Sequence, residues 1–136
     1  MSSAGIGDTF GPAVARLELE INLDEHGGLY SIDFSSLPFQ PQRLFFIEAS
    51  NAGVMRGGHA HKTAHQLLVC VSGSIDVRAV CSGHEEKVCL NRPGLALYLA
   101  PLVWSEQVYA SAGSRLLVLS SEPFDPASYI HDLDEL

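Results

Sequence analysis

The alternation of apolar and polar residues in short segments is the feature that most constrains what this chain can fold into. Arg16-Leu17-Glu18-Leu19-Glu20-Ile21 places its aliphatic side chains on one face of an extended segment and its charged side chains on the other. A period of two is typical of a half-buried β-strand, whereas an amphipathic helix needs apolar residues three and four positions apart. The pattern returns in residues 29–34 and 43–48. We therefore predict strands and almost no helix.

Turn-forming residues separate these segments at near-regular intervals. Pro38 and Pro41 interrupt sheet hydrogen bonding, Gly73 turns the chain, and residues 82–85 are typical of a hairpin turn. About nine or ten short strands with such turns predict an all-β fold, and a double-sheet jelly roll fits this count. Residues 126–136 are expected to form a short helical or irregular C-terminal tail. The remaining predicted strands are residues 66–71, 74–80, 86–90, 96–100, 103–109 and 115–120.

Length and charge narrow the class of protein. A chain of 136 residues favours one domain, which we place at residues 1–136, with residues 1–14 as a flexible N-terminal segment. The 16 acidic residues against 8 Lys and Arg give a net charge of -8. This balance argues against nucleic-acid or membrane-surface binding, since both need a cationic face. The first residues lack the basic and apolar stretches of a signal peptide.

The cysteines indicate the redox compartment. They are odd in number and have no CxxC spacing, namely Cys70, Cys81 and Cys89. Reduced thiols, most of them buried, in a cytoplasmic protein are the simplest interpretation.

The histidines are concentrated in one segment that is also locally basic. His59, His61 and His65 lie within residues 58–65, and three of the 8 basic residues, Arg43, Arg56 and Lys62, lie in or just before it. On an extended strand, His59 and His61 would project from one face, about 7 Å apart. Two neighbouring imidazoles can bind a metal, transfer protons near neutral pH or hydrogen-bond a ligand. A solvated surface pair is the alternative, but the flanking glycines and cations favour function.

The spacing around these histidines resembles the first sequence motif of the cupins, which are jelly-roll proteins. Gly53, His59-x-His61, Gln66 and Gly73 match that motif, with Gln66 where metal-binding cupins have Glu. Metal-binding cupins take another histidine from a second motif, but residues 101–106, which correspond to it, contain none. A metal site would have to combine the histidine pair with His65 or Glu106, so it is the weaker interpretation.

A closer resemblance covers nearly the whole chain, and it is to the dTDP-sugar 3,4-ketoisomerases, the WxcM-like cupins. It rests on residues 56–62 (RGGHAHK), 66–70 (QLLVC), 73–74 (GS), 97–104 (LYLAPLVW), 118–121 (VLSS) and 129–130 (YI). The resemblance implies a single cupin jelly roll (a double-stranded β-helix) that forms a cytoplasmic homodimer and needs no metal or other cofactor. It also implies isomerisation of dTDP-4-keto-6-deoxyglucose to a dTDP-3-keto-6-deoxyhexose. Such products lead to deoxy amino sugars of surface polysaccharides, including lipopolysaccharide.

The residues fit that reaction. Moving a ketone from C4 to C3 of the sugar requires a base, an acid and an enediol(ate) intermediate, and two imidazoles supply the base and the acid in either assignment. Cations stabilise the enediolate oxygen and the pyrophosphate, and aromatic rings pack against sugar or thymine, although the aromatic residues also suit a barrel core. We expect His59 and His61 to be catalytic and the following to bind substrate: Arg43, Arg56, Lys62, Gln66, Tyr98 and Trp104.

The chain departs from the family pattern where it has His26, Phe45, Phe46 and Ser105. Each change removes a polar group from a position expected to face the ligand. Two further hypotheses therefore stand beside the isomerase: a non-catalytic cupin that binds a nucleotide sugar or another small anion, and a metal-dependent cupin. The alternating N-terminal strand would leave an exposed sheet edge in a single copy, which is a second reason to expect a homodimer.

Overall fold

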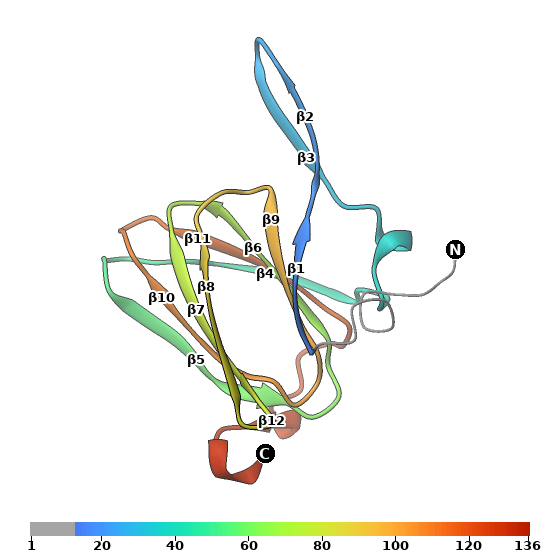
Figure 1. Cartoon of the computed structure of the whole chain (residues 1–136), viewed down its shortest axis with the longest axis vertical. Helices are drawn as coiled ribbons and strands as arrows, with labels where there is room; N and C mark the ends of the chain where they lie inside the picture. The colour runs from blue at the N-terminus through green and yellow to red at the C-terminus, as the bar shows by residue number, and fades with distance from the viewer. Residues whose placement is uncertain (1–12) are drawn as a thin grey trace.

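Alternating strands bury their apolar faces by pairing into two sheets that pack against each other, as predicted for a jelly roll (Figure 1). The computed structural model describes residues 13–136. In the first sheet the order is β1 (Val14–Glu18), β9 (Leu95–Leu99), β6 (Gln66–Ser72), β11 (Arg115–Ser120) and β4 (Arg43–Glu48). In the second sheet it is β12 (Tyr129–Ile130), β5 (Val54–His61), β10 (Trp104–Tyr109), β7 (Ile75–Cys81) and β8 (His84–Leu90). Neighbouring strands are antiparallel throughout the described residues.

Two clusters of buried residues lie on opposite faces of the first sheet. Leu68 and Leu116 pack between the sheets with Val77 of β7. Leu67, one position away from Leu68, belongs to a second cluster on the outer face, which Leu37 and other residues of the β3–β4 connection cover. That connection includes a 3-10 turn, η1 (Phe34–Ser36). Side chains of β6 are therefore buried on both faces, which explains the continuous apolar run in its sequence.

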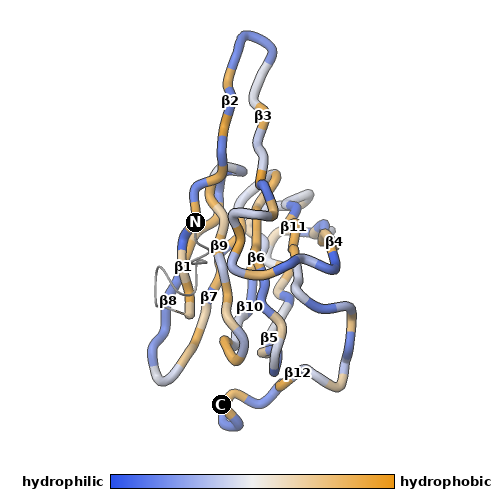
Figure 2. Tube along the Cα trace, turned by 90° about the vertical axis from the view of Figure 1, so that its right-hand side faces the viewer, coloured by the Kyte–Doolittle hydropathy of each residue, from blue (hydrophilic) through white to orange (hydrophobic). Residues whose placement is uncertain are grey.

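A hairpin of β2 (Glu20–Asp24) and β3 (Gly27–Ser31) extends beyond the two sheets. Figure 2 shows hydrophobic residues along the strands of the body and hydrophilic residues at the tip of this hairpin. Apolar side chains on the hairpin nevertheless remain exposed: Ile21, Leu23, Leu29 and Tyr30. The predicted strand at residues 16–21 is thus divided at Leu19, where the chain leaves β9 and pairs with β3 instead.

Several sequence predictions are confirmed and others are corrected. Residues 43–48 and 115–120 are strands with the predicted bounds. The predicted strand at residues 29–34 ends at Ser31, because η1 follows. The C-terminal tail is irregular: it contains the 3-10 turns η2 (Pro126–Ser128) and η3 (Leu133–Glu135) and the short strand β12. Of the expected flexible segment 1–14, residues 1–12 lie outside the described residues, and Val14 already belongs to β1.

The structure also bears on the cysteines and on membrane-spanning helices. Cys70 is buried, Cys81 is half-buried and Cys89 is exposed. The prediction that most of the thiols are buried is therefore wrong. All three are free. Within residues 13–136, no helix is long and apolar enough to cross a membrane.

Candidate active site

A β-bulge shapes the strand that carries the histidine pair. In the pairing of β5 with β10, His59 lies opposite Ser105, while Gly57 lies opposite Glu106, so Gly58 is left as the extra residue. Gly57 and Gly58 have φ angles of 90° and 80°, which residues other than glycine rarely adopt. A Cβ atom on Gly57 would lie 2.8 Å from the carbonyl oxygen of Ser105. The glycines next to the histidines are therefore required by the backbone.

The bulge also decides which side chains meet. On a regular strand, residues three positions apart point to opposite faces. Because of the extra residue, Arg56 and His59 both line one cavity of about 150 Å³ between the two sheets. Other residues that line it are Phe45, Gln66, Ser105 and Gln107. The cavity therefore places a histidine, a cation and uncharged polar groups around one small space.

The two catalytic candidates lie side by side, as the sequence predicted. The ring centroids of His59 and His61 are 5.0 Å apart, with the rings nearly perpendicular. β12 pairs with the end of β5 and brings Tyr129 opposite His61. The Tyr129 ring stacks on His59 with a centroid distance of 4.5 Å and meets His61 edge to face at 4.5 Å. His131 follows, with its ring centroid 5.8 Å from that of His59.

Burial keeps both imidazoles of the pair neutral near pH 7. It is the largest cause that lowers the pKa of His61 to about 4, with His59 and Arg43 lowering it further and Glu122 opposing them. The pKa of His59 is also lowered, first by burial and then by His131, against a hydrogen bond with the backbone of Gly57. The buried Nε2 of His61 has no hydrogen-bond partner among the described residues. A neutral imidazole with an unpaired nitrogen is suited to accept a proton.

Arg43, at the start of β4, places a guanidinium close enough to His61 to influence its pKa. The guanidinium carbon lies 4.3 Å from the ring centroid of Phe45 and 5.1 Å from that of Phe124. Such stacking holds the planar cation in one orientation. The structure thus brings together five of the predicted residues at or near the cavity: His59, His61, Arg43, Arg56 and Gln66.

Three predicted binding residues lie elsewhere, and strand alternation explains two of these placements. Trp104 is on the face of β10 opposite to Ser105, and its ring packs under the guanidinium of Arg78, whose Cζ is 5.4 Å from the ring centroid. Tyr98 is buried in the outer cluster, where its hydroxyl lies 2.7 Å from Nδ1 of His65. Lys62 is exposed just after β5. Both Trp104 and Tyr98 are buried in the structure.

The positions that depart from the family pattern also separate into two groups. Phe45 and Ser105 line the cavity. Phe46 points away from it and is 66% exposed, and His26 is exposed in the turn of the β2–β3 hairpin. Only the first two changes therefore alter the cavity of this chain directly.

Sequence reasoning missed Tyr129 and His131 as members of the site. The pair Tyr129-Ile130 was visible as part of the family resemblance, but nothing in the local sequence predicted that it would form a strand beside β5. His131 is exposed, yet it lies next to His59. Pairing between distant segments is the information that the local pattern lacks.

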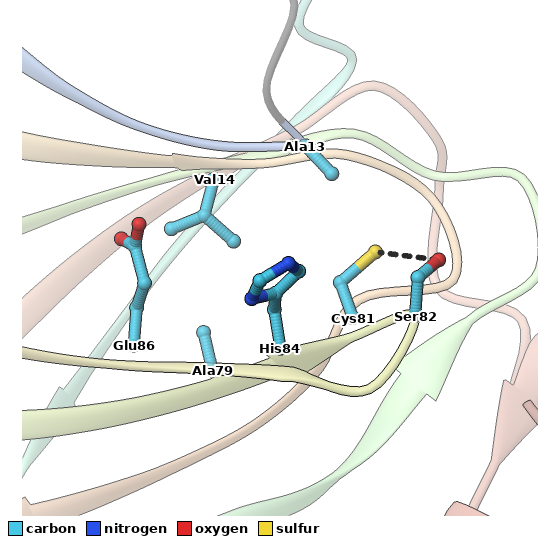
Figure 3. A pocket seen from close by; sticks show the side chains of 7 residues that line it. All are labelled: Ala13, Val14, Ala79, Cys81, Ser82, His84 and Glu86. Carbon is cyan, nitrogen blue, oxygen red and sulfur yellow. Dashed lines mark hydrogen bonds between the residues drawn. The ribbon is translucent and has the colours of Figure 1, made fainter.

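A larger cavity of about 450 Å³ lies between β1 and the β7–β8 hairpin (Figure 3). His84 and Glu86 line it together with Cys81, whose sulfur is 3.8 Å from the hydroxyl of Ser82. It shares no lining residue with the cavity that contains His59. In residues 13–136, no three His, Cys, Asp or Glu side chains are placed to hold a metal ion.

Comparison with known proteins relates this geometry to a family. The sequence model described as "FdtA: WxcM-like, C-terminal" matches residues 13–136. Over 113 residues, the chain is 33% identical to TDP-4-oxo-6-deoxy-alpha-D-glucose-3,4-oxoisomerase of Aneurinibacillus thermoaerophilus, a match that covers 82% of this chain and 81% of that protein.

Solved structures agree with this match. QdtA, a sugar 3,4-ketoisomerase from Thermoanaerobacterium thermosaccharolyticum solved with TDP, has 35% sequence identity and a TM-score of 0.85, covering 90% of this chain and 93% of that one. The WlaRB TDP-quinovose 3,4-ketoisomerase of Campylobacter jejuni has 36% identity and a TM-score of 0.84, covering 90% of this chain and 95% of that one.

Proposed function

The chain belongs to the FdtA family, described as WxcM-like, C-terminal, and from this membership we propose that it is a 3,4-ketoisomerase of a dTDP-linked keto sugar. The substrate is dTDP-4-keto-6-deoxyglucose, and the product is a dTDP-3-keto-6-deoxyhexose used to make deoxy amino sugars. The observation that carries the proposal is the pair of neutral, partly buried imidazoles of His59 and His61 beside a cavity that Arg56 also lines.

The reaction is an internal redox exchange that needs only proton transfers. A base removes the proton on C3, and the electrons of that C–H bond form a C3–C4 double bond while the C4 ketone becomes an enolate oxygen. The proton on the C3 hydroxyl is then lost as the C3 ketone forms, the enolate oxygen gains a proton, and an acid delivers a proton to C4. His59 and His61 supply the base and the acid: a neutral imidazole of the pair accepts the C3 proton, and an imidazole that has become protonated serves as the acid.

The cations of the site have separate roles in this proposal. Arg56 lines the cavity with His59 and stabilises the negative oxygen of the enediolate. Arg43, held against Phe45, binds the pyrophosphate, since a planar guanidinium forms two parallel bonds with phosphate oxygens. Gln66 lines the cavity and hydrogen-bonds the sugar, whereas the exposed Lys62 is not among the residues that line the cavity. No metal or other cofactor takes part.

Proton NMR in D2O tests the proposal directly. dTDP-4-keto-6-deoxyglucose is incubated with metal-stripped protein, and the expected result is a 3-keto product with deuterium at a ring carbon. His59→Asn should abolish turnover while leaving binding of the nucleotide sugar nearly intact. His84→Gln, which removes an exposed histidine on β8, is the matched control. Retention of the substrate and of its C3 proton by the wild-type protein would reject the isomerase.

Phe45 and Ser105 favour one alternative, a cupin that binds a nucleotide sugar without catalysis. Both residues line the cavity and lack the polar groups that the family pattern has there. If wild type and His59→Asn bind dTDP equally and neither turns over any keto sugar tested, this alternative replaces the isomerase.

We also propose that the protein is a homodimer. Leu23 and Leu29 of the hairpin are 72% and 60% exposed, and a groove on the outer face of the first sheet is lined by apolar residues that include Leu19, Leu44 and Val71. Apolar surfaces of this kind are commonly covered by a partner. A monomeric mass by light scattering at micromolar concentration would contradict the dimer.

The cytoplasm is the proposed location. Three free cysteines without a disulfide among them are stable in a reducing compartment. Fractionation of cells that express the protein at its natural level would test this location.

A further inference from the structure

Three imidazoles form a row from the interior of the protein to its surface. His61 has a buried ring nitrogen, His59 is half-buried, and His131 is exposed. The ring centroids are 5.0 Å apart for His61 and His59, and 5.8 Å apart for His59 and His131. The rings of each pair meet edge to face, at separations that one bridging water spans.

An aromatic ring and charged groups surround the pair. Tyr129 stacks on one face of His59 and covers an edge of His61. Arg43 lowers the pKa of His61 and Glu122 raises it. His131, in the segment after β12, lowers the pKa of His59. A cation such as Arg43 does not carry protons, since it stays protonated at working pH.

In the proposed reaction, a row of imidazoles can exchange the proton taken from C3 with water. After the proton on C3 has been removed, it resides on one imidazole of the pair. It can return directly to C4 of the same sugar, or it can exchange with water first. Because both imidazoles are neutral at rest, an exposed group that carries protons between the pair and the solvent determines which of these outcomes prevails.

We propose that His131 is the outlet of a proton relay, His61–His59–His131, which exchanges the proton held during isomerisation with bulk water. The relay rests on the proposed function, since it serves the His59 and His61 pair of that reaction. His131 acts through His59 and is not itself required to touch the sugar.

The fate of the C3 proton tests the relay. Unlabelled substrate is converted in D2O at low buffer concentration, and the protium retained at C4 of the product is measured by NMR. We expect mostly deuterium for the wild type and for the control His84→Gln. In His131→Gln the retained protium should rise at least about threefold, and turnover should fall on the order of tenfold. Free imidazole at tens of millimolar should reverse both effects.

A second variant separates proton transfer from charge. His131→Arg places a permanent positive charge near His59 but cannot release a proton. If His131 only contributes charge or packing, His131→Arg behaves as the wild type, and the relay is refuted. If it behaves as His131→Gln and imidazole rescues it, the relay stands. Equal protium retention in the wild type and His131→Gln also refutes it.

A measurement without substrate distinguishes failure of the relay from failure of the proposed function. The exchange of the imidazole N–H protons of His59 and His61 with water is followed by NMR in the substrate-free protein. The exchange should slow on the order of tenfold in His131→Gln and recover with added imidazole. Unchanged exchange overturns the relay even if the wild-type protein isomerises the sugar. Slowed exchange in a protein that turns over no sugar keeps the relay and rejects the isomerase.

Discussion

Burial of His61 should make the stability of the protein depend on pH in a defined window. The pKa of this imidazole falls from 6.5 to about 4 on folding, chiefly because burial disfavours the charged form. The unfolded chain therefore binds more protons than the folded protein between these values. The stabilising difference is fully present above pH 6.5 and is lost as the pH falls through this range toward 4.

The size of the effect follows from the shift. Each pKa unit corresponds to about 1.4 kcal/mol, which sets a ceiling of about 3 kcal/mol. His61 remains partly open to solvent, and screening by water reduces this to about 1–2 kcal/mol. We expect the free energy of unfolding of the wild type to fall by that much more than that of His61→Gln between pH 7.5 and pH 4.5.

Urea unfolding at intervals of half a pH unit measures this difference. The wild type and His61→Gln are compared at each pH, so that carboxylates common to both proteins cancel. His84→Gln reports the effect of removing an exposed imidazole on β8. If the stability curves of the wild type and His61→Gln run parallel over the whole range, His61 is not desolvated as the structure indicates.

Three further predictions concern the backbone, the cation and the hairpin. Gly57→Ala should lower the free energy of unfolding by about 1–3 kcal/mol in thermal unfolding. It should also reduce kcat, because its Cβ would lie 2.8 Å from the Ser105 carbonyl oxygen. The control Gly53→Ala, with a φ of 85° but nothing within 4 Å of its Cβ, should have the backbone strain without the loss of kcat. Arg43→Lys should raise KM about tenfold with a smaller effect on kcat, because lysine cannot stack between two rings or bind phosphate in two places; steady-state kinetics in which KM is unchanged would count against a binding role. Leu23→Glu should shift a dimer toward monomer in light scattering, since this residue is 72% exposed, and it should leave the circular dichroism spectrum unchanged.

Strands whose alternation reflects burial on one face were the predictable part of the fold. Residues 43–48 have exposed and partly buried side chains in strict alternation, and their bounds match the prediction. The break at Leu19 was not predictable, because the alternation continues through it while the pairing partner changes from β9 to β3. A local pattern records which face is buried and does not record which strand covers the edge.

The same limit applies to the site. The spacing of His59 and His61 was enough to predict that they share a face, and the structure agrees. Trp104 was expected to meet the ligand, but its neighbour Ser105 faces the cavity and the alternation of β10 turns the indole away. Whether a residue faces inward depends on the register and on the bulge at Gly58, and both are set by contacts with β10.

The pairing of β5 has a consequence for how the protein reaches its native state. The neighbours of this strand, β10 and β12, come from far later in the chain, whereas β7–β8 and β2–β3 are hairpins of adjacent segments. Closing long loops carries an entropic cost that local hairpins avoid, so non-local strands join slowly. A refolding molecule should therefore form the β7–β8 and β2–β3 hairpins before Tyr129 reaches His61. Recovery of function should lag behind recovery of the far-ultraviolet signal, and the interval between them is the time needed for distant parts of the chain to meet.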